Sequence, residues 1–395
     1  MTARADRRRI PLRWSLAEED EEGALFPDET ATTRHVGTGE FRGMEFLHVN
    51  ARSIVNPVPA ASRMSFRYTI NPYRGCSHAC NYCFARPTHD YLGLDIGEDF
   101  ERRIVVKVNA VERLRAELRS PKWAGEHIAM GTNTDPYQSA EGKYHLTQGV
   151  VSTLAEHRNP FSILTKSTLI LRDLKLLTAA ARRTPVHLNF SIGTLDRQVW
   201  KLTEPGTPPP ERRLSAVRKL NEAGIPCGVL IAPVLPGLSD GDEQVREVVE
   251  ACVDAGAISV AAIGLHLRPG VREHFMGWLA GQRPDLIPLY ERRFRRGAYQ
   301  PKAEQARLSG LVADVLQQKG TGTRQVRRYI EDLEEGGGGG PGIVRAGIVR
   351  AGIVRGGRRP GGGAGRPARP GARTAAGSHR AGGRGTASAS LGSFR

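Results

Sequence analysis

The sequence predicts an α/β fold: an open, partial (βα)6 TIM-like barrel with a helical C-terminal extension and a disordered tail. From Phe66 onward, short β-rich apolar runs alternate with helical patterns, which indicates βα units and a parallel sheet. Six such units occupy about 200 residues, whereas an eight-stranded barrel needs about 250, so we expect an incomplete barrel. The tail is set apart by composition, since residues 336–395 hold 11 arginines and no lysine, aspartate or glutamate. The first 335 residues therefore carry only +5 of the formal net charge of +16.

Four segments follow from these patterns. Residues 1–55 are charged and irregular, although Met44–Val49 is apolar enough to add one strand. Residues 56–270 form the barrel core, and residues 271–335 form a helical extension. Residues 336–395, rich in glycine, arginine and proline, cannot bury enough apolar surface to fold alone.

The core strands are expected where short apolar runs end at polar or turn residues. These runs are Phe66–Asn71, His127–Gly131, Phe161–Thr165, Val186–Thr194, Cys227–Pro233 and Ile258–Gly264. An insertion after the first strand adds a strand at Arg103–Val108 and a helix from Asn109, its N-cap, to Leu118. Apolar periodicity predicts the other helices at Leu146–Glu156, Leu169–Arg182, Arg212–Gly224 and Glu243–Gly256. The proline-rich segment Glu204–Pro210 is expected to be a loop that either covers the active face or only connects two elements.

Three of the five cysteines follow the first core strand. Cys76, Cys80 and Cys83 are spaced so that one tight loop can direct three thiolates to a single point, as an iron–sulfur cluster or a zinc ion requires. A zinc loop would need His78 or His89 as its fourth ligand. Cys227 and Cys252 have apolar neighbours, and we expect both to be buried structural cysteines.

With Tyr82 before the third cysteine, the motif is C-x3-C-x-aromatic-C, which resembles the signature of the radical S-adenosylmethionine (SAM) superfamily. The resemblance implies a [4Fe-4S] cluster whose open iron binds SAM. In this superfamily the reduced cluster cleaves SAM, and the resulting 5′-deoxyadenosyl radical abstracts hydrogen from a substrate. An external electron donor of the flavodoxin or ferredoxin type is then the expected partner.

Polar residues at the strand ends are the candidates for binding SAM. Thr132, Thr134 and Asp135 follow the second strand, where the family contacts the SAM amino group; the alternative is an ordinary turn. Lys166 ends the third strand and could hold the SAM carboxylate, or it could simply extend to solvent. Ser191 near the end of the fourth strand completes the set. Tyr82 is expected to pack against the adenosyl group or to take part in radical transfer.

Several stretches together resemble the spore photoproduct lyase-like, DNA repair-related branch of the superfamily. They are Gly75–Asp95, Gly131–Gln138, Thr165–Ser167, Ser191–Asp196 and Ala232–Asp240. The branch's lyase returns hydrogen from a cysteine in the segment that aligns with Thr132–Asp135, and this chain has none there. Photoproduct repair is therefore not implied, and the catalytic residue stays unassigned.

Three classes of function remain open. The chain could act on nucleic acid, act on a peptide or small molecule, or be a metal-binding module without catalysis. Basic clusters with aromatic residues at Tyr290–Tyr299 and Arg324–Tyr329 would suit nucleic acid, although such runs are more often solvated helix faces.

The composition also bears on the compartment. No apolar run approaches the length of a membrane span, and the N-terminus lacks the apolar region of a signal peptide. Five cysteines do not make a disulfide framework in a chain of 395 residues, and a thiolate-held cluster needs a reducing compartment. We therefore expect a cytoplasmic protein with no membrane partner, while the oligomeric state is not encoded in any motif.

Overall fold

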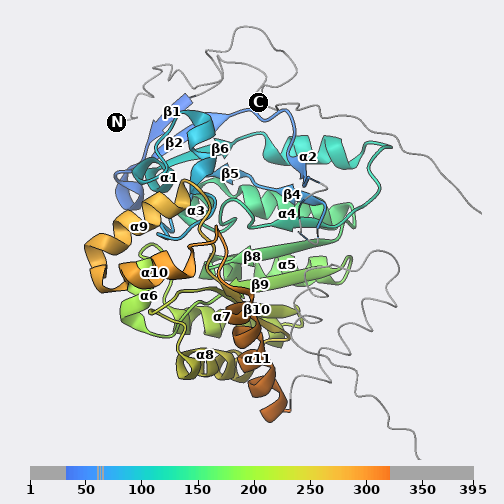
Figure 1. Ribbon diagram of the computed structural model, residues 1–395. Helices are drawn as coiled ribbons and strands as arrows, with labels where there is room; N and C mark the ends of the chain where they lie inside the picture. Colours follow the sequence, from blue (N-terminus) through green and yellow to red (C-terminus); the bar gives the residue numbers. More distant parts are fainter. Residues whose placement is uncertain (1–32, 60–61, 63, 65, 321–395) are drawn as a thin grey trace, which may run out of the picture. The chain divides into compact units, whose positions relative to one another are not determined.

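The six predicted core strands form one continuous parallel sheet. The computed structural model describes residues 33–59, 62, 64 and 66–320. The parallel strands are β4 (Tyr68–Ile70), β7 (Ile128–Met130), β8 (Phe161–Thr165), β9 (Val186–Ser191), β10 (Cys227–Val234) and β11 (Val260–Gly264). They lie in the order β11-β10-β9-β8-β7-β4, and β3 (Val55–Pro57) adds an antiparallel edge beside β4. The chain therefore has the predicted α/β fold with a parallel sheet typical of a partial barrel (Figure 1).

Helices connect the strands and pack on the sheet. The connections contain α4 (Leu146–Glu156), η6 (Thr168–Asp173) with α5 (Leu174–Ala181), α7 (Pro210–Glu222) and α8 (Asp242–Asp254). The short helices α3 (Ser139–Tyr144) and α6 (Arg197–Thr203) were not predicted. The predicted helix at Leu169–Arg182 starts as a 3-10 turn, and Ser167 caps this turn by accepting a hydrogen bond from the Leu169 N–H.

The C-terminal extension is helical as far as it is described. It consists of α9 (Val271–Gln282), η7 (Pro284–Leu286), α10 (Ile287–Arg293) and α11 (Lys302–Gln318). Leu308, Leu311, Val312 and Val315 of α11 belong to the same buried cluster as the sheet. The cluster at Arg324–Tyr329 and the tail at 336–395 lie outside the described residues, as do residues 1–32.

A second sheet, built partly from the N-terminal segment, corrects one expectation. Residues 1–55 were expected to be irregular apart from Met44–Val49, which does form β2 (Glu45–Val49). The structure adds β1 (Thr33–Val36), and the sheet runs β1-β2-β6-β5 with β6 (Arg103–Lys107) and β5 (Tyr73–Arg74). Short 3-10 turns and one short helix surround it: η3 (Gly39–Phe41), η4 (Arg86–Thr88), η5 (Asp90–Leu92) and α1 (Glu98–Arg102).

Asn109 shows a second correction. It stands at the N-cap position of α2 (Ala110–Leu118), but its side chain makes no capping bond. Its amide instead pairs with the backbone of Ala51, accepting from the N–H at 2.8 Å and donating to the C=O at 3.0 Å. A long-range partner thus replaces the local one. Asn109 thereby connects the segment that follows β2 to the start of α2.

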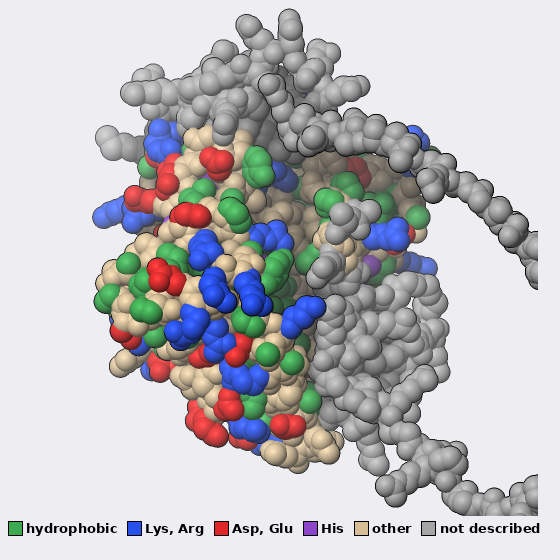
Figure 2. All heavy atoms as spheres, viewed as in Figure 1, with side chains coloured by type: hydrophobic (Ala, Val, Ile, Leu, Met, Phe, Trp, Pro, Cys, Tyr) green, Lys and Arg blue, Asp and Glu red, His purple; other side chains and the backbone are tan. Residues whose placement is uncertain are grey.

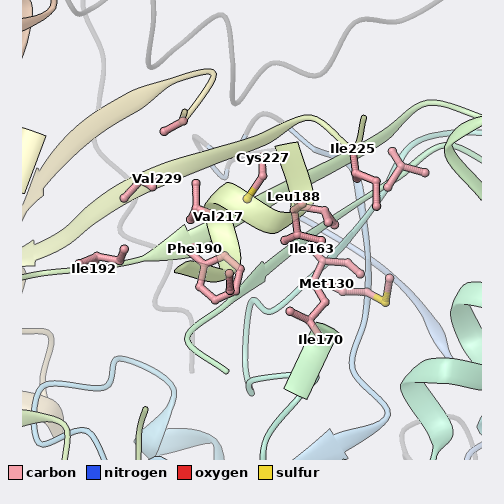
Figure 3. Packing of buried hydrophobic residues seen from close by; sticks show 14 of the residues in the cluster. Met130, Ile163, Ile170, Leu188, Phe190, Ile192, Val217, Ile225, Cys227 and Val229 are labelled. Carbon is pink, nitrogen blue, oxygen red and sulfur yellow. The ribbon is translucent and has the colours of Figure 1, made fainter. Parts of the chain in front are cut away.

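The main core lies between the sheet and its helices. Four neighbouring strands, β7 to β10, contribute Met130, Ile163, Leu188, Phe190 and Val229, which are at most 1% exposed (Figure 3). Cys227 and Cys252 are fully buried, as the sequence predicted. Among the described residues, no helix is both long and apolar enough to cross a membrane.

Candidate functional site

The three clustered cysteines occupy one buried loop after β4 and β5. Cys76 and Cys80 are each 7% exposed and Cys83 is half-buried; all three are free. Gly75 begins the loop with φ +78°, and a Cβ there would approach the Phe100 carbonyl oxygen to 2.8 Å. The Cys76 N–H donates to that same carbonyl at 2.8 Å. Gly75 is thus required both for its backbone angle and for the close approach of the chain.

The chemistry of this loop fits an iron–sulfur cluster. Burial raises the pKa of Cys80 to about 12 and that of Cys76 well above its usual value, and the nearby Asp135 charge, followed by Cys80 and Cys83, adds to the effect on Cys76. Such thiols become thiolates only when a metal supplies compensating positive charge.

Both histidines considered as zinc ligands have other partners. His89 is fully buried, its Nε2 lies 2.9 Å from the Arg103 carbonyl oxygen, and its ring packs on Phe100. His78 Nδ1 lies 3.4 Å from Asp135 Oδ2. Burial lowers the pKa of both rings.

Four of the predicted SAM-site residues come together at the carboxyl ends of the strands. Asp135 accepts hydrogen bonds from the Thr165 hydroxyl at 2.6 Å and from the Lys166 N–H at 2.7 Å. The Lys166 ammonium donates to Ser191 Oγ at 2.8 Å and lies 5.7 Å from the centre of the Tyr82 ring. Lys166 is therefore directed across the strand ends towards the cysteine loop, not out to solvent.

The two threonines after β7 differ from that group. The Thr134 hydroxyl donates to the Gly75 carbonyl oxygen at 2.6 Å, and Gln138 donates to the same oxygen at 2.9 Å. Thr134 thus holds the cysteine loop in place. The Thr132 hydroxyl donates a long hydrogen bond of 3.4 Å to Asn71 Oδ1.

Sequence reasoning missed a buried ion pair behind Tyr82. Glu204 is 4% exposed and Arg213 is 1% exposed, and they pair directly; Glu204 also accepts the hydrogen bond of the Tyr82 hydroxyl. Burial alone would raise the pKa of Glu204, but Arg213, Lys166 and these hydrogen bonds together lower it, so the carboxylate is ionised. Arg213 further donates to the Ser191 carbonyl oxygen at 3.0 Å.

The segment between α6 and α7 is fastened to the cysteine loop. The Gly206 N–H donates to the His78 carbonyl oxygen at 3.1 Å, and the Asn81 N–H donates to the Thr203 carbonyl oxygen at 3.1 Å. A Cβ on Gly206 would lie 2.2 Å from the Ser77 carbonyl oxygen. The proline-rich loop therefore packs against the cysteine loop and is hydrogen-bonded to it, and we call this contact the clamp. Beside it lies an open cleft of about 690 Å³, lined by His78, Tyr137, Ser167, Arg172 and the 205–208 segment among others.

Known proteins resemble this chain along most of the described core. The family model described as "Radical SAM superfamily" matches residues 70–252. An uncharacterized protein of Mycobacterium tuberculosis, Rv2578c, is 46% identical over 283 residues, which cover 72% of this chain and 83% of that protein. An uncharacterized protein of Methanocaldococcus jannaschii, MJ0683, is 30% identical over 206 residues, covering 52% of this chain and 73% of that one.

Solved structures resemble the fold. Spore photoproduct lyase complexed with dinucleoside spore photoproduct superimposes with a TM-score of 0.51 at 20% identity, covering 69% of this chain and 79% of that one. At this identity the likeness bears on the fold, and it agrees with the partial barrel described above.

Proposed function

Because the chain belongs to the radical SAM superfamily, we propose that it cleaves SAM reductively and uses the resulting radical to abstract hydrogen from a substrate. Membership implies a [4Fe-4S] cluster and SAM as cofactors. When bound, the reduced cluster supplies the electron that breaks a carbon–sulfur bond of SAM. The observation that supports the proposal best is the convergence of Lys166, Ser191 and Tyr82 beside the cysteine loop.

Each of these residues has a role in the proposal. Cys76, Cys80 and Cys83 would hold three irons and leave the fourth open. The Lys166 ammonium would bind the SAM carboxylate as a point charge, and Ser191 Oγ, which accepts from Lys166, fixes its direction. Asp135 would take part in SAM binding, while it also fixes the Lys166 backbone. Thr134 would act indirectly, through the Gly75 carbonyl, and Thr132, whose hydroxyl bonds Asn71, would be a further SAM contact after β7.

The first experiment is anaerobic reconstitution with iron and sulfide, followed by reduction in the presence of SAM and chromatography for 5′-deoxyadenosine. The expected result is an iron–sulfur absorption band and the nucleoside from wild type, with neither from the Cys83→Ala variant. Stoichiometric zinc with no nucleoside would instead indicate a metal-binding module, and would refute the proposed activity.

Nucleic acid is the substrate class that we propose to test first. A spore photoproduct lyase structure of similar fold is described as complexed with a dinucleoside photoproduct. The cluster at Tyr290–Tyr299 supports this class only in part, because Tyr290 and Phe294 are fully buried and cannot stack on bases. The test is whether single-stranded DNA or RNA raises the rate of 5′-deoxyadenosine formation; an equal rate with and without both would leave the peptide or small-molecule class.

A further inference from the structure

An exposed aromatic group lies beside the cysteine loop. Phe84, which directly follows Cys83, is 46% exposed, and its ring centre lies 5.9 Å from that of His266. His266 in turn stacks on Tyr299, which is 65% exposed, with ring centres 5.6 Å apart. We call Phe84, His266 and Tyr299 the aromatic edge. Neither the fold nor SAM binding explains why the Phe84 ring, next to a proposed cluster ligand, and the Tyr299 ring are exposed.

Exposed basic side chains come from the two segments that also carry His266 and Tyr299. Arg292, Arg295 and Arg296 are exposed at the end of α10 and directly after it. None of the three has an acidic partner among the residues that the structure describes, although Arg293 beside them pairs with Glu304. Arg268 reaches the Tyr299 hydroxyl at 3.4 Å. Figure 2 shows basic side chains gathered on this face, over α10 and the segment that follows it.

The basic segment shares a buried hydrophobic cluster with the cysteine loop. Phe294 and Tyr290 are fully buried in one cluster with Cys80 and Tyr82, and Cys83 packs against that cluster. The backbone N–H of Leu267 donates to the Ala298 carbonyl oxygen at 2.7 Å, which joins the segment to the chain after β11. The segment that carries the arginines therefore shares a buried cluster with the proposed cluster-binding loop.

We propose that the aromatic edge, with Arg268, Arg292, Arg295 and Arg296, is the docking surface for a small acidic one-electron donor of the flavodoxin or ferredoxin type. This inference rests on the proposed function, since only a redox cluster needs such a donor. In the transfer, the reduced donor loses one electron, and that electron reduces the cluster held by Cys76, Cys80 and Cys83. No atoms are exchanged.

Position and charge both support this partner. Electron transfer between proteins weakens steeply with distance, so a donor must dock where a cluster ligand comes nearest to the surface. Cys83 is the least buried of the three cysteines, and the next residue, Phe84, has an exposed side chain. Redox encounters use small interfaces, and complementary charge raises their association rate. Unpaired arginines facing an acidic donor provide that charge.

The same surface fits a nucleic acid less well. Bases bind single-stranded sites by stacking on free ring faces. Here the His266 and Tyr299 rings stack on each other at an interplanar angle of 22°, and the Phe84 ring leans on His266. The inner ring faces are therefore already covered, and Tyr290 and Phe294 are buried.

The test compares two reductants on the reconstituted holoprotein. Reduced flavodoxin from a bacterium is the docking probe, and photoreduced 5-deazariboflavin is a small uncharged reductant that needs no docking surface. The readout is bleaching of the cluster absorbance in stopped flow without SAM, so that it does not depend on SAM cleavage. The variant carries R292E, R295E and R296E; the matched control carries K175E, R182E and R183E, three exposed basic residues in and just after α5.

We expect the rate constant for reduction by flavodoxin to fall about tenfold or more in the R292E/R295E/R296E variant, and wild type to lose a similar factor as salt is raised. Reduction by 5-deazariboflavin should be unchanged, and so should both rates in the control. An unchanged rate of reduction by flavodoxin would overturn the proposal. An equal loss of rate with both reductants would also overturn it, if the milder R295Q/R296Q variant showed the same equal loss. Loss of single-stranded DNA binding with an intact flavodoxin rate would assign the surface to nucleic acid instead. If the cluster is reduced normally but SAM is never cleaved, the proposed function fails while the docking surface stands.

Discussion

Replacing Glu204 by alanine tests how strongly the residues behind Tyr82 hold the site together. The change leaves Arg213, which is 1% exposed, without its carboxylate, and removes the acceptor of the Tyr82 hydroxyl. Breaking a buried ion pair from one side typically destabilises by 3–5 kcal/mol, roughly. Arg213 keeps the Pro208 and Ser191 carbonyl oxygens as acceptors, at 2.7 and 3.0 Å. We therefore expect the lower end, about 3 kcal/mol in the free energy of unfolding.

The assay is urea unfolding of the protein before cluster reconstitution, followed by far-ultraviolet circular dichroism. Glu211→Ala is the matched control, because Glu211 is exposed and its ion pair with Arg197, at 3.4 Å, lies on the surface. Its loss should change the free energy of unfolding by less than about 1 kcal/mol. Glu204→Gln retains an acceptor for Tyr82 and should fall between the two. If Glu204→Ala were no more destabilising than Glu211→Ala, the buried pair would not be holding this part of the fold.

Three further changes probe the site and its support. Lys166→Ala should weaken SAM binding by about ten- to a hundredfold, as expected for a lost charged hydrogen bond, measured by equilibrium dialysis on reconstituted protein; an unchanged dissociation constant would favour a metal-binding module. Gly206→Ala should lower iron bound per chain, because its Cβ would lie 2.2 Å from the Ser77 carbonyl oxygen, and full iron loading would show that the clamp is dispensable. Burial lowers the pKa of His127 to about 4, so the unfolded chain takes up a proton below about pH 6.5 while the folded chain does not. Stability should thus fall between pH 6.5 and pH 4, by on the order of 3 kcal/mol for this residue. A pH titration of urea midpoints should show a shallower slope for His127→Phe, and an identical slope would contradict this assignment.

Local patterns explain which features could be predicted. The core strands and most connecting helices appear where the periodicity placed them, because alternation and 3.6-residue spacing report which face of an element is buried. The cysteine loop was found for a different reason, since its spacing is a requirement of the ligand geometry and lies within eight residues. The place of Lys166 and Ser191 at the strand ends was also predictable, and their role in SAM binding stays a prediction.

The missed features depend on partners that are distant in the sequence. Tyr82 and Glu204 are 122 positions apart, and nothing near Glu204 marks it as a buried anion. Asn109 had the right position for a cap, but its amide is used by Ala51, 58 residues earlier. Tyr290 and Phe294 were read as surface aromatics because arginines surround them. Their four-residue spacing was the available signal, since it places both on one helix face, and that face is buried.

The long-range contacts also explain how a short motif becomes a site. Ser191 is held from two sides, because its hydroxyl joins Lys166 to the Ala232 carbonyl oxygen and its own carbonyl oxygen accepts from Arg213. Arg213 pairs with Glu204, and Glu204 holds Tyr82 of the cysteine motif. Lys166, which lies over the Tyr82 ring, closes this chain of contacts. The residue proposed to bind the SAM carboxylate and the loop proposed to bind the cluster are therefore fixed by the same buried ion pair. A change at Glu204 should consequently disturb both together, although Glu204 would touch neither cofactor.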